Sequence, residues 1–162
     1  MWSMRARGST VVRGQARRLR RRARLAAVSD SECIFCRIVA GELPATVIER
    51  DAQTLTFLDI APATRGHALV IPTRHTADLW EITPDELSAV TLAARRQALR
   101  VRDRLGAAGV NLINSCRAEA WQTVFHFHMH VIPRYPGDPL KLPWTPAAGD
   151  PAEIAAAARA LS

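Results

Sequence analysis

Residues 126–134 read HFHMHVIPR, and three of the chain's five histidines stand in this stretch at alternate positions. Successive side chains of a β-strand point to opposite faces. A strand here would place the three imidazoles on one face and Phe125, Phe127 and Met129 on the other. Imidazole titrates near neutral pH and serves as nucleophile, proton carrier or metal ligand. The pattern therefore predicts a strand with one chemical face and one core face.

Charge divides the 162 residues into a basic N-terminal segment and a nearly neutral remainder. Residues 1–30 hold nine arginines against Asp30 alone, whereas residues 31–162 hold 13 basic and 14 acidic residues. Residues 1–30 have no apolar periodicity, so we expect a disordered extension. Their apolar run is too short for a signal peptide. A transit peptide, a nucleic-acid-binding arm and a true start downstream of Met1 are the open interpretations.

The composition argues against several classes of protein. No apolar run approaches the ~20 residues that span a bilayer, so we expect a soluble protein without a membrane partner. Three cysteines are not the framework of a secreted disulfide protein, and we expect a cytoplasmic location. Lys141 is the only lysine among 22 basic residues, a skew that disfavours nucleic acid as a partner.

Residues 31–135 are predicted to form one α+β domain: a five-stranded antiparallel sheet with one short and one long helix. The predicted strands are 45–50, 55–60, 67–72, 110–113 and 124–133. Ser31 is the predicted N-cap of the short helix, which stops at Gly41. A capping box from Thr83 to Glu86 opens the long helix, and Gly106 follows its end. Its apolar stripe consists of Leu87, Val90, Ala94, Ala98, Val101 and Leu105.

Residues 136–162 are predicted to be a separate C-terminal segment. Five prolines exclude a helix or a central strand over most of it: Pro136, Pro139, Pro143, Pro146 and Pro151. We expect an extended chain that wraps the surface of the domain. An alanine-rich terminal helix should begin at about Ala152.

The sequence from about Glu32 to Arg134 resembles the histidine triad (HIT) family, whose members hydrolyse or transfer nucleotides at the α-phosphate. Two separated motifs carry the resemblance: QTVFHFHMHVIPR at residues 122–134, and FLDIAP at 57–62 followed by GHALVIP at 66–72. The resemblance implies a HIT-like α+β fold, a purine nucleotide substrate and a homodimer with one continuous sheet.

The resemblance also implies roles for individual positions. His128 would be the nucleophile, and Asp59 would accept both ribose hydroxyls. The other implied substrate-binding positions are Asn114, Gln122, Thr123, Val124 and His130 around the phosphate, and Ile34, Phe35, Ile38, Phe57, Ile60 and Leu69 in the base slot. Trp121 stands where the family commonly has glycine. It either covers the loop or narrows the channel of the leaving group.

A structural zinc site is the predicted cofactor site. Cys33-x-x-Cys36 and the remaining histidines allow a tetrahedral Cys2His2 centre, although paired thiols can also be redox-active or simply buried. The zinc-bearing branch of the resembling family implies four ligands: Cys33, Cys36, His75 and His126. His67 would then buttress the catalytic strand from beneath.

The leading hypothesis is a nucleotide hydrolase or nucleotidyl transferase that acts on purine nucleoside phosphoramidates through a covalent nucleotidyl-His128 intermediate. Such an intermediate divides one slow displacement into two quicker ones. A dinucleoside polyphosphate hydrolase or phosphorylase is the enzymatic alternative, because it differs only on the leaving-group side of the pocket. The alternative of another class is a zinc-stabilised nucleotide-binding module with little turnover.

Overall fold

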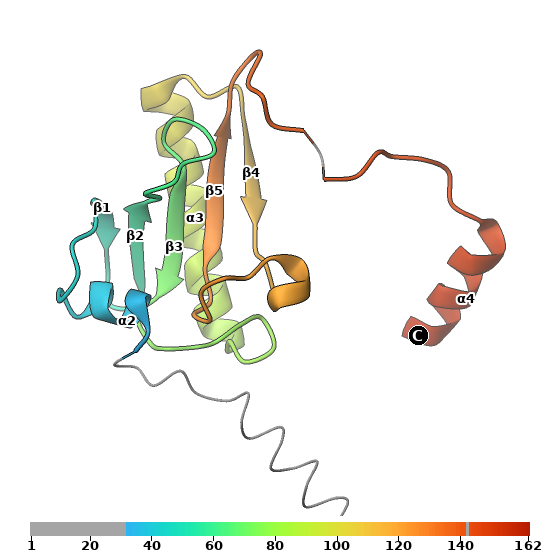
Figure 1. Ribbon diagram of the computed structural model, residues 1–162, viewed down its shortest axis with the longest axis horizontal. Coiled ribbons are helices and arrows are strands. Elements are labelled where there is room, and N and C mark those ends of the chain that lie inside the picture. The colour runs from blue at the N-terminus through green and yellow to red at the C-terminus, as the bar shows by residue number, and fades with distance from the viewer. Residues whose placement is uncertain (1–31, 142) are drawn as a thin grey trace, which may run out of the picture.

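The computed structural model describes residues 32–141 and 143–162, so residues 1–30 and the predicted cap Ser31 lie outside the described residues. Within them, five strands form one antiparallel sheet in the order β1-β2-β3-β5-β4. The strands are β1 (Val47–Arg50), β2 (Thr54–Leu58), β3 (Ala68–Pro72), β4 (Gly109–Ile113) and β5 (Met129–Arg134). Helices α2 (Ile34–Val39) and α3 (Pro84–Leu105) lie on opposite faces of the sheet (Figure 1). The predicted α+β class and five-stranded antiparallel sheet are confirmed.

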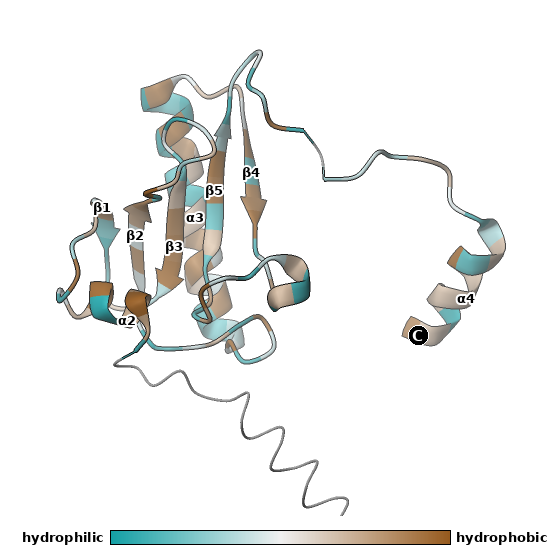
Figure 2. Cartoon of the chain, viewed as in Figure 1, coloured by the Kyte–Doolittle hydropathy of each residue, from teal (hydrophilic) through white to brown (hydrophobic). Residues whose placement is uncertain are grey.

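Alternate residues of the central strands feed two separate cores. In β3, Leu69 and Ile71 pack with Phe35 of α2 on one face. Val70, between them, packs with Val90 of α3 on the other face. Figure 2 shows that β2 and β3 are among the most hydrophobic segments of the chain. Both faces of the sheet are therefore buried, and the small helix α2 leaves room beside it for a cavity.

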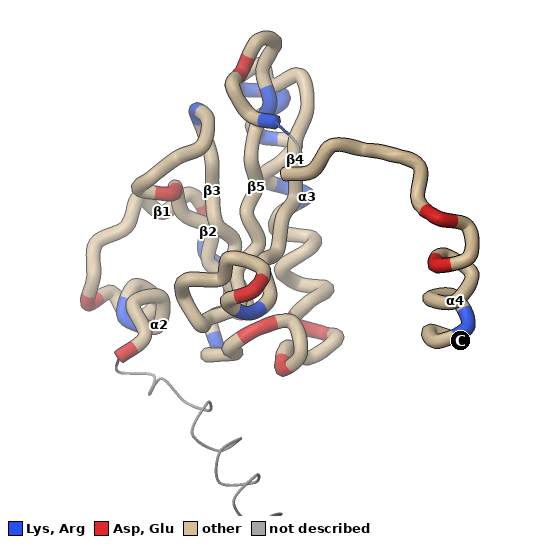
Figure 3. Tube along the Cα trace, turned by 45° about the vertical axis from the view of Figure 1, so that its right-hand side comes forward, with Lys and Arg blue, Asp and Glu red and all other residues tan. Residues whose placement is uncertain are grey.

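Helix α3 begins and ends where the sequence predicts. Thr83 and Glu86 form the reciprocal capping box, and Gly106 ends the helix at φ +70°, a left-handed conformation that glycine adopts without strain. Gln97 is 4% exposed and lies among the apolar stripe, which the pattern did not indicate. Figure 3 shows charged residues of both signs on the loops and on α3 and α4.

The last strand is shorter than predicted. It begins at Met129 rather than residue 124. Continuing the β3–β5 register past Met129 would bring Phe127 opposite Pro72, and proline has no N–H for the ladder. The N–H of Phe127 donates instead to the Thr76 carbonyl, at 2.6 Å. The segment before Met129 is therefore irregular, and only one histidine of the triad, at position 130, lies on a strand.

Because residues 124–128 are not a strand, the side chains predicted to face the core are not all buried. Phe127 is fully buried against α3, as the alternation predicts, whereas Phe125 is 38% exposed. The three imidazoles nevertheless lie together on the α2 side, as expected: Phe35 contacts the rings of His126 and His128, and the ring of His128 contacts that of His130. Each imidazole is placed by its own contacts.

Two further elements differ from expectation. The short helix is capped by Cys33, whose sulfur accepts the N–H of Cys36 at 3.5 Å. A 3-10 helix, η1 (Ala118–Ala120), follows β4. The N-cap therefore carries one of the predicted metal ligands.

The C-terminal segment ends in the expected helix, α4 (Pro151–Leu161), with Asp150 as its N-cap. The expectation that this segment wraps the domain is wrong. Every residue from Pro143 to Ser162 is exposed, and Figures 1 and 3 place α4 apart from the sheet. An alanine-rich helix offers little apolar area to bury against the sheet. Among the described residues, no helix combines the length and apolarity that crossing a bilayer requires.

Candidate functional site

A cavity of about 460 Å³ opens on the α2 face of the sheet. Its volume falls in the range of ordinary small-molecule sites. Most predicted substrate positions line it: Ile34, Phe35, Ile38, Phe57, Asp59, Ile60, Leu69, Thr123, Val124, His128 and His130. The walls are largely apolar, with one carboxylate and two imidazoles among them. Such a lining suits a planar apolar group attached to a polar one.

Sequence reasoning missed one wall of the cavity. Leu43, Pro44 and Ala45, which connect α2 to β1, complete the lining together with Leu58 of β2. Ala45 and Leu58 lie in predicted strands and Leu43 and Pro44 in no predicted element, and no signal in the sequence marked any of the four as part of a site. Ile60 lines the cavity but is 99% exposed, so a ligand would cover a side chain that the free protein leaves open.

Two predicted positions lie outside the lining and hold the backbone around the site instead. The Gln122 amide accepts the N–H of Arg117 and donates to the carbonyl of Ala77, both at 2.7 Å. Asn114 Nδ2 donates to the carbonyl of His128 at 2.9 Å. Their side chains therefore fix the loop that carries the triad.

The tautomer of His128 is set by one backbone group. Its Nδ1 lies 2.7 Å from the carbonyl oxygen of His126, and a carbonyl only accepts. Nδ1 therefore carries the hydrogen, and Nε2 is the basic nitrogen. Burial lowers the pKa of His128, so the ring is neutral at pH 7. A neutral imidazole with a free Nε2 is a nucleophile ready to act.

A second chain of hydrogen bonds fixes His67 and His130. The N–H of Ala63 donates to Nδ1 of His67 at 3.1 Å, so the hydrogen of that ring is on Nε2. This Nε2 donates to Nδ1 of His130 at 2.9 Å. Nε2 of His130 must then carry the hydrogen of its own ring, which makes it a donor. Burial, helped by the neighbouring imidazoles, lowers the pKa of His130 to about 4.

His67 was expected to buttress the catalytic strand, and its contact with that strand is the hydrogen bond from Nε2 to His130. The same nitrogen lies 3.7 Å from an oxygen of Asp59. Burial lowers the pKa of His67, so this contact joins a carboxylate to a neutral ring at pH 7. The GHALVIP motif contains His67, but the motif alone does not identify its hydrogen-bond partner, because His130 is 63 residues away in the sequence.

The four predicted metal ligands converge. The ligand atoms of Cys33, Cys36, His75 and His126 all lie within 4.8 Å of one another. Cys36 Sγ lies 3.2 Å from Nδ1 of His75, and both sulfurs lie 3.5 Å from Nδ1 of His126. A tetrahedral zinc ion, with Zn–S and Zn–N bonds of about 2.3 and 2.0 Å, separates sulfur from nitrogen by about 3.5 Å. The cluster fits such an ion.

His126 is oriented for this role by its other nitrogen. Nε2 lies 2.9 Å from the carbonyl of Pro72 and must donate to it, which leaves the lone pair of Nδ1 facing the two sulfurs. The first histidine of the triad therefore belongs to the metal cluster, and the other two line the cavity.

Asp59, His67 and His130 also bring potential ligand atoms within 4.8 Å of one another. The hydrogen-bond pattern argues against a metal here. Nε2 of His67 faces this cluster and carries a hydrogen, because Nδ1 accepts the amide of Ala63. A nitrogen that bears hydrogen has no lone pair for a metal.

Trp121 adopts a left-handed conformation, with φ +69°, at the end of η1. This conformation explains why a glycine suits the position. The indole is 71% exposed and does not line the cavity. In the free protein it does not narrow a channel within this cavity.

Replacing Trp121 with glycine is expected to stabilise the protein by up to about 1 kcal/mol. A non-glycine residue in this conformation costs roughly 1–2 kcal/mol, of which glycine's greater freedom in the unfolded chain offsets about half. Urea unfolding would measure the change. Trp80, 72% exposed and without a positive φ, is the matched control: Trp80→Gly should not stabilise. A Trp121→Gly protein no more stable than the parent would contradict the strain argument.

Comparison with known proteins identifies relatives of this chain in sequence and in structure. The HIT domain model matches residues 40–137. Protein hit of Bacillus subtilis (strain 168) is 40% identical over 119 residues, which are 73% of this chain and 82% of that protein. A Zn-bound histidine triad family protein from Mycobacterium smegmatis has a TM-score of 0.68 and 42% identity, covering 74% of this chain and 86% of that one. A histidine triad nucleotide-binding protein from Candida albicans has a TM-score of 0.69 and 31% identity, covering 80% and 94%.

Proposed function

Because the chain belongs to the HIT domain family, we propose that it hydrolyses or transfers nucleotides at the α-phosphate of purine nucleotide conjugates, with phosphoramidates as substrates. The observation that carries the proposal is the tautomer of His128. The carbonyl of His126 holds the hydrogen on Nδ1, so Nε2 is a free base on a ring that lines the cavity. The same ring is neutral at pH 7 because burial lowers its pKa.

In the proposed reaction, Nε2 of His128 attacks the α-phosphorus and the bond to the leaving nitrogen breaks, as that nitrogen takes up a proton from solvent and departs as an amine. The ring then carries a phosphorus–nitrogen bond and a positive charge. Its Nδ1–H bond to the His126 carbonyl, 2.7 Å in the free protein, becomes charge-assisted and so stronger at that moment. Water next attacks the phosphorus, breaks the phosphorus–nitrogen bond and releases the nucleoside monophosphate, the neutral imidazole and a proton to solvent.

Two donors are proposed to stabilise charge on the phosphate. Nε2 of His130 carries a hydrogen because its Nδ1 accepts from His67, and Thr123, which has a hydroxyl donor, lines the same cavity. Hydrogen bonds aimed at the nonbridging oxygens strengthen as the transition state forms. We expect Asn114 and Gln122 to serve the phosphate indirectly, through the loop that they hold.

Asp59 is proposed to bind the ribose hydroxyls. One of its oxygens accepts the N–H of Ala61 at 2.8 Å, which fixes the carboxylate at the cavity wall. Asp59→Asn should weaken binding of adenosine 5′-phosphoramidate by about tenfold, because a hydrogen bond to a charged group is worth about 1.5–3 kcal/mol. The matched substrate is the 2′,3′-dideoxy analogue, whose KM should not change. Equal losses on both substrates would contradict the assignment.

The alternative functions can be distinguished by which substrates the protein cleaves. A dinucleoside polyphosphate hydrolase or phosphorylase would use the same nucleophile, so kcat/KM for the phosphoramidate and for a diadenosine polyphosphate should be compared on one preparation. A binding module of low turnover would bind AMP in this cavity and cleave neither. The free Nε2 of His128 favours the enzyme.

We further propose that zinc occupies the cluster of Cys33, Cys36, His75 and His126, as the Mycobacterium smegmatis relative is Zn-bound. Four protein ligands leave no open coordination position, so the ion would be structural and take no part in the reaction. Its proposed contribution is to hold the segment between His126 and His128, and thus the carbonyl that sets the nucleophile's tautomer.

A homodimer and a cytoplasmic location complete the proposal. Strand β4 is an edge of the sheet, and its Leu112 and Ile113 are 44% and 43% exposed. An edge strand with unpaired backbone groups and apolar side chains suits pairing with a second copy. This supports the continuous intersubunit sheet that the family resemblance implies.

A further inference from the structure

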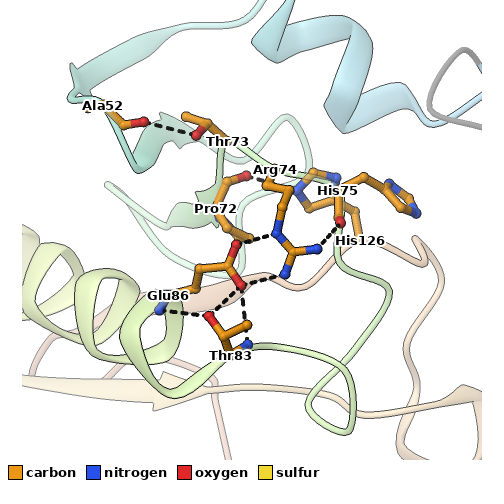
Figure 4. A network of polar contacts seen from close by, with 8 residues as sticks. All are labelled: Ala52, Pro72, Thr73, Arg74, His75, Thr83, Glu86 and His126. Carbon is orange, nitrogen blue, oxygen red and sulfur yellow. Dashed lines mark hydrogen bonds and ion pairs between the residues drawn. The ribbon is translucent and has the colours of Figure 1, made fainter.

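The four proposed metal ligands are held in different ways. Cys33 and Cys36 belong to the cap and first turn of α2, and His126 donates from its second nitrogen to Pro72. His75 comes from the loop between β3 and α3, where no helix or strand fixes the backbone. The residue before it, Arg74, makes contacts that restrain this part of the loop (Figure 4).

One guanidinium joins that loop to the start of α3. Nε and a terminal nitrogen of Arg74 donate to the two carboxylate oxygens of Glu86, each at 2.6 Å, in a bidentate pair. The other terminal nitrogen donates to the carbonyl of His75 at 3.2 Å. Figure 4 shows the guanidinium between the helix cap and the His75 backbone.

Glu86 is itself fixed. Its second oxygen accepts the hydroxyl of Thr83 at 2.8 Å and the Thr83 N–H at 3.2 Å, which completes the capping box. The hydrogen bond from Arg74 is the main reason that the pKa of Glu86 falls to about 2, so the carboxylate stays ionised at any pH at which the protein is handled. The Arg74–Glu86 pair is therefore anchored at the N-terminal end of α3, a helix that packs on the sheet.

The Arg74 side chain is 57% exposed, and an exposed ion pair ordinarily adds little to global stability. Its geometry nevertheless restrains the backbone next to a metal ligand. Restraint of a ligand before the ion arrives raises metal affinity, because less freedom is lost on binding.

We infer that Arg74 is a positioning residue for the proposed zinc site: it clamps the His75 backbone to the capping box of α3 and so holds Nδ1 of His75 against Cys36. This inference rests on the zinc site proposed above. It concerns metal affinity and is independent of the proposed reaction. Loss of a group that supports a metal ligand typically lowers affinity 10–100-fold, and we expect about tenfold here because Arg74 acts on the backbone.

The test is a zinc titration of the full chain, stripped of metal and competed against a chromophoric chelator. Arg74→Ala should bind zinc about tenfold more weakly than the parent, and Arg74→Lys should lose most of the same affinity because an ammonium cannot make the bidentate fork. Arg96→Ala is the matched control. It removes an inter-element pair of the same kind, Arg96 Nε to Glu49 at 2.9 Å, far from the ligands, and should keep parental affinity.

A double-mutant cycle with Glu86→Gln separates the clamp from simple destabilisation. If Arg74 acts through Glu86, the double variant should bind zinc no more weakly than the Arg74→Ala variant. The unfolding midpoint of the metal-free protein should fall less in Arg74→Ala than that of the zinc-loaded protein. Parental affinity in both Arg74 variants would overturn the inference, and so would a parent protein that binds no zinc. Neither result would bear on nucleotide turnover, which is measured separately.

Discussion

Replacing His128 with alanine is expected to abolish turnover of adenosine 5′-phosphoramidate, with a loss of at least about 10³-fold in kcat. The imidazole forms the bond to phosphorus in the proposed reaction, and no other neutral base with a free nitrogen lines the cavity among the described residues. Binding of AMP should persist, because a nucleophile contributes to the transition state far more than to ground-state affinity.

Covalent catalysis also leaves a product that can be isolated. Quenching the parent protein during turnover without acid, followed by peptide mass spectrometry, should find a nucleotide on His128. His130→Ala is the comparison variant, since it lacks one phosphate donor rather than the bond-forming group. It should be slower by about 10²–10³-fold and still form the adduct. Full activity of the His128 variant would refute the mechanism. A parent protein that binds AMP but cleaves no conjugate would favour the binding module.

Replacing Cys33 with serine is expected to remove the metal and more than about 3 kcal/mol of stability in zinc-replete buffer. Metal binding at a closed four-ligand site is coupled to folding, so loss of one ligand loses most of that free energy. Serine is a good N-cap, so Cys33→Ser preserves the cap of α2 that the cysteine provides. The effect should therefore report the metal rather than the helix.

Elemental analysis and thermal unfolding together would check this prediction. Purified parent protein should contain about one zinc per chain, and Cys33→Ser should contain none. Cys116→Ser is the matched control, because Cys116 is a free cysteine outside the cluster and should leave both zinc content and stability unchanged. A parent protein that contains no zinc after purification without chelator would refute the proposed zinc site.

Local sequence determined most of the scaffold. The capping box at Thr83 and the glycine at 106 gave the start and end of α3, because the caps are contacts between residues three to five apart. The strand at residues 67–72 was predicted, and its alternate side chains enter two different cores because a strand's two faces are fixed by its backbone. The metal ligands were expected from the Cys-x-x-Cys spacing and the family resemblance, and the structure brings their atoms together.

The orientation and tautomer of each histidine were decided by tertiary structure, whereas the family resemblance had already implied their roles. Alternation placed three imidazoles on one strand face, but Pro72 cannot extend the ladder, and its carbonyl binds His126 instead. His126 therefore joins the metal cluster, while His128 and His130 line the cavity. The clamp between Arg74 and Glu86 was equally invisible in the sequence. A tautomer depends on which donor or acceptor lies about 3 Å from each ring nitrogen. For His126 and His130 that partner is more than 50 residues away, so only the folded chain determines it.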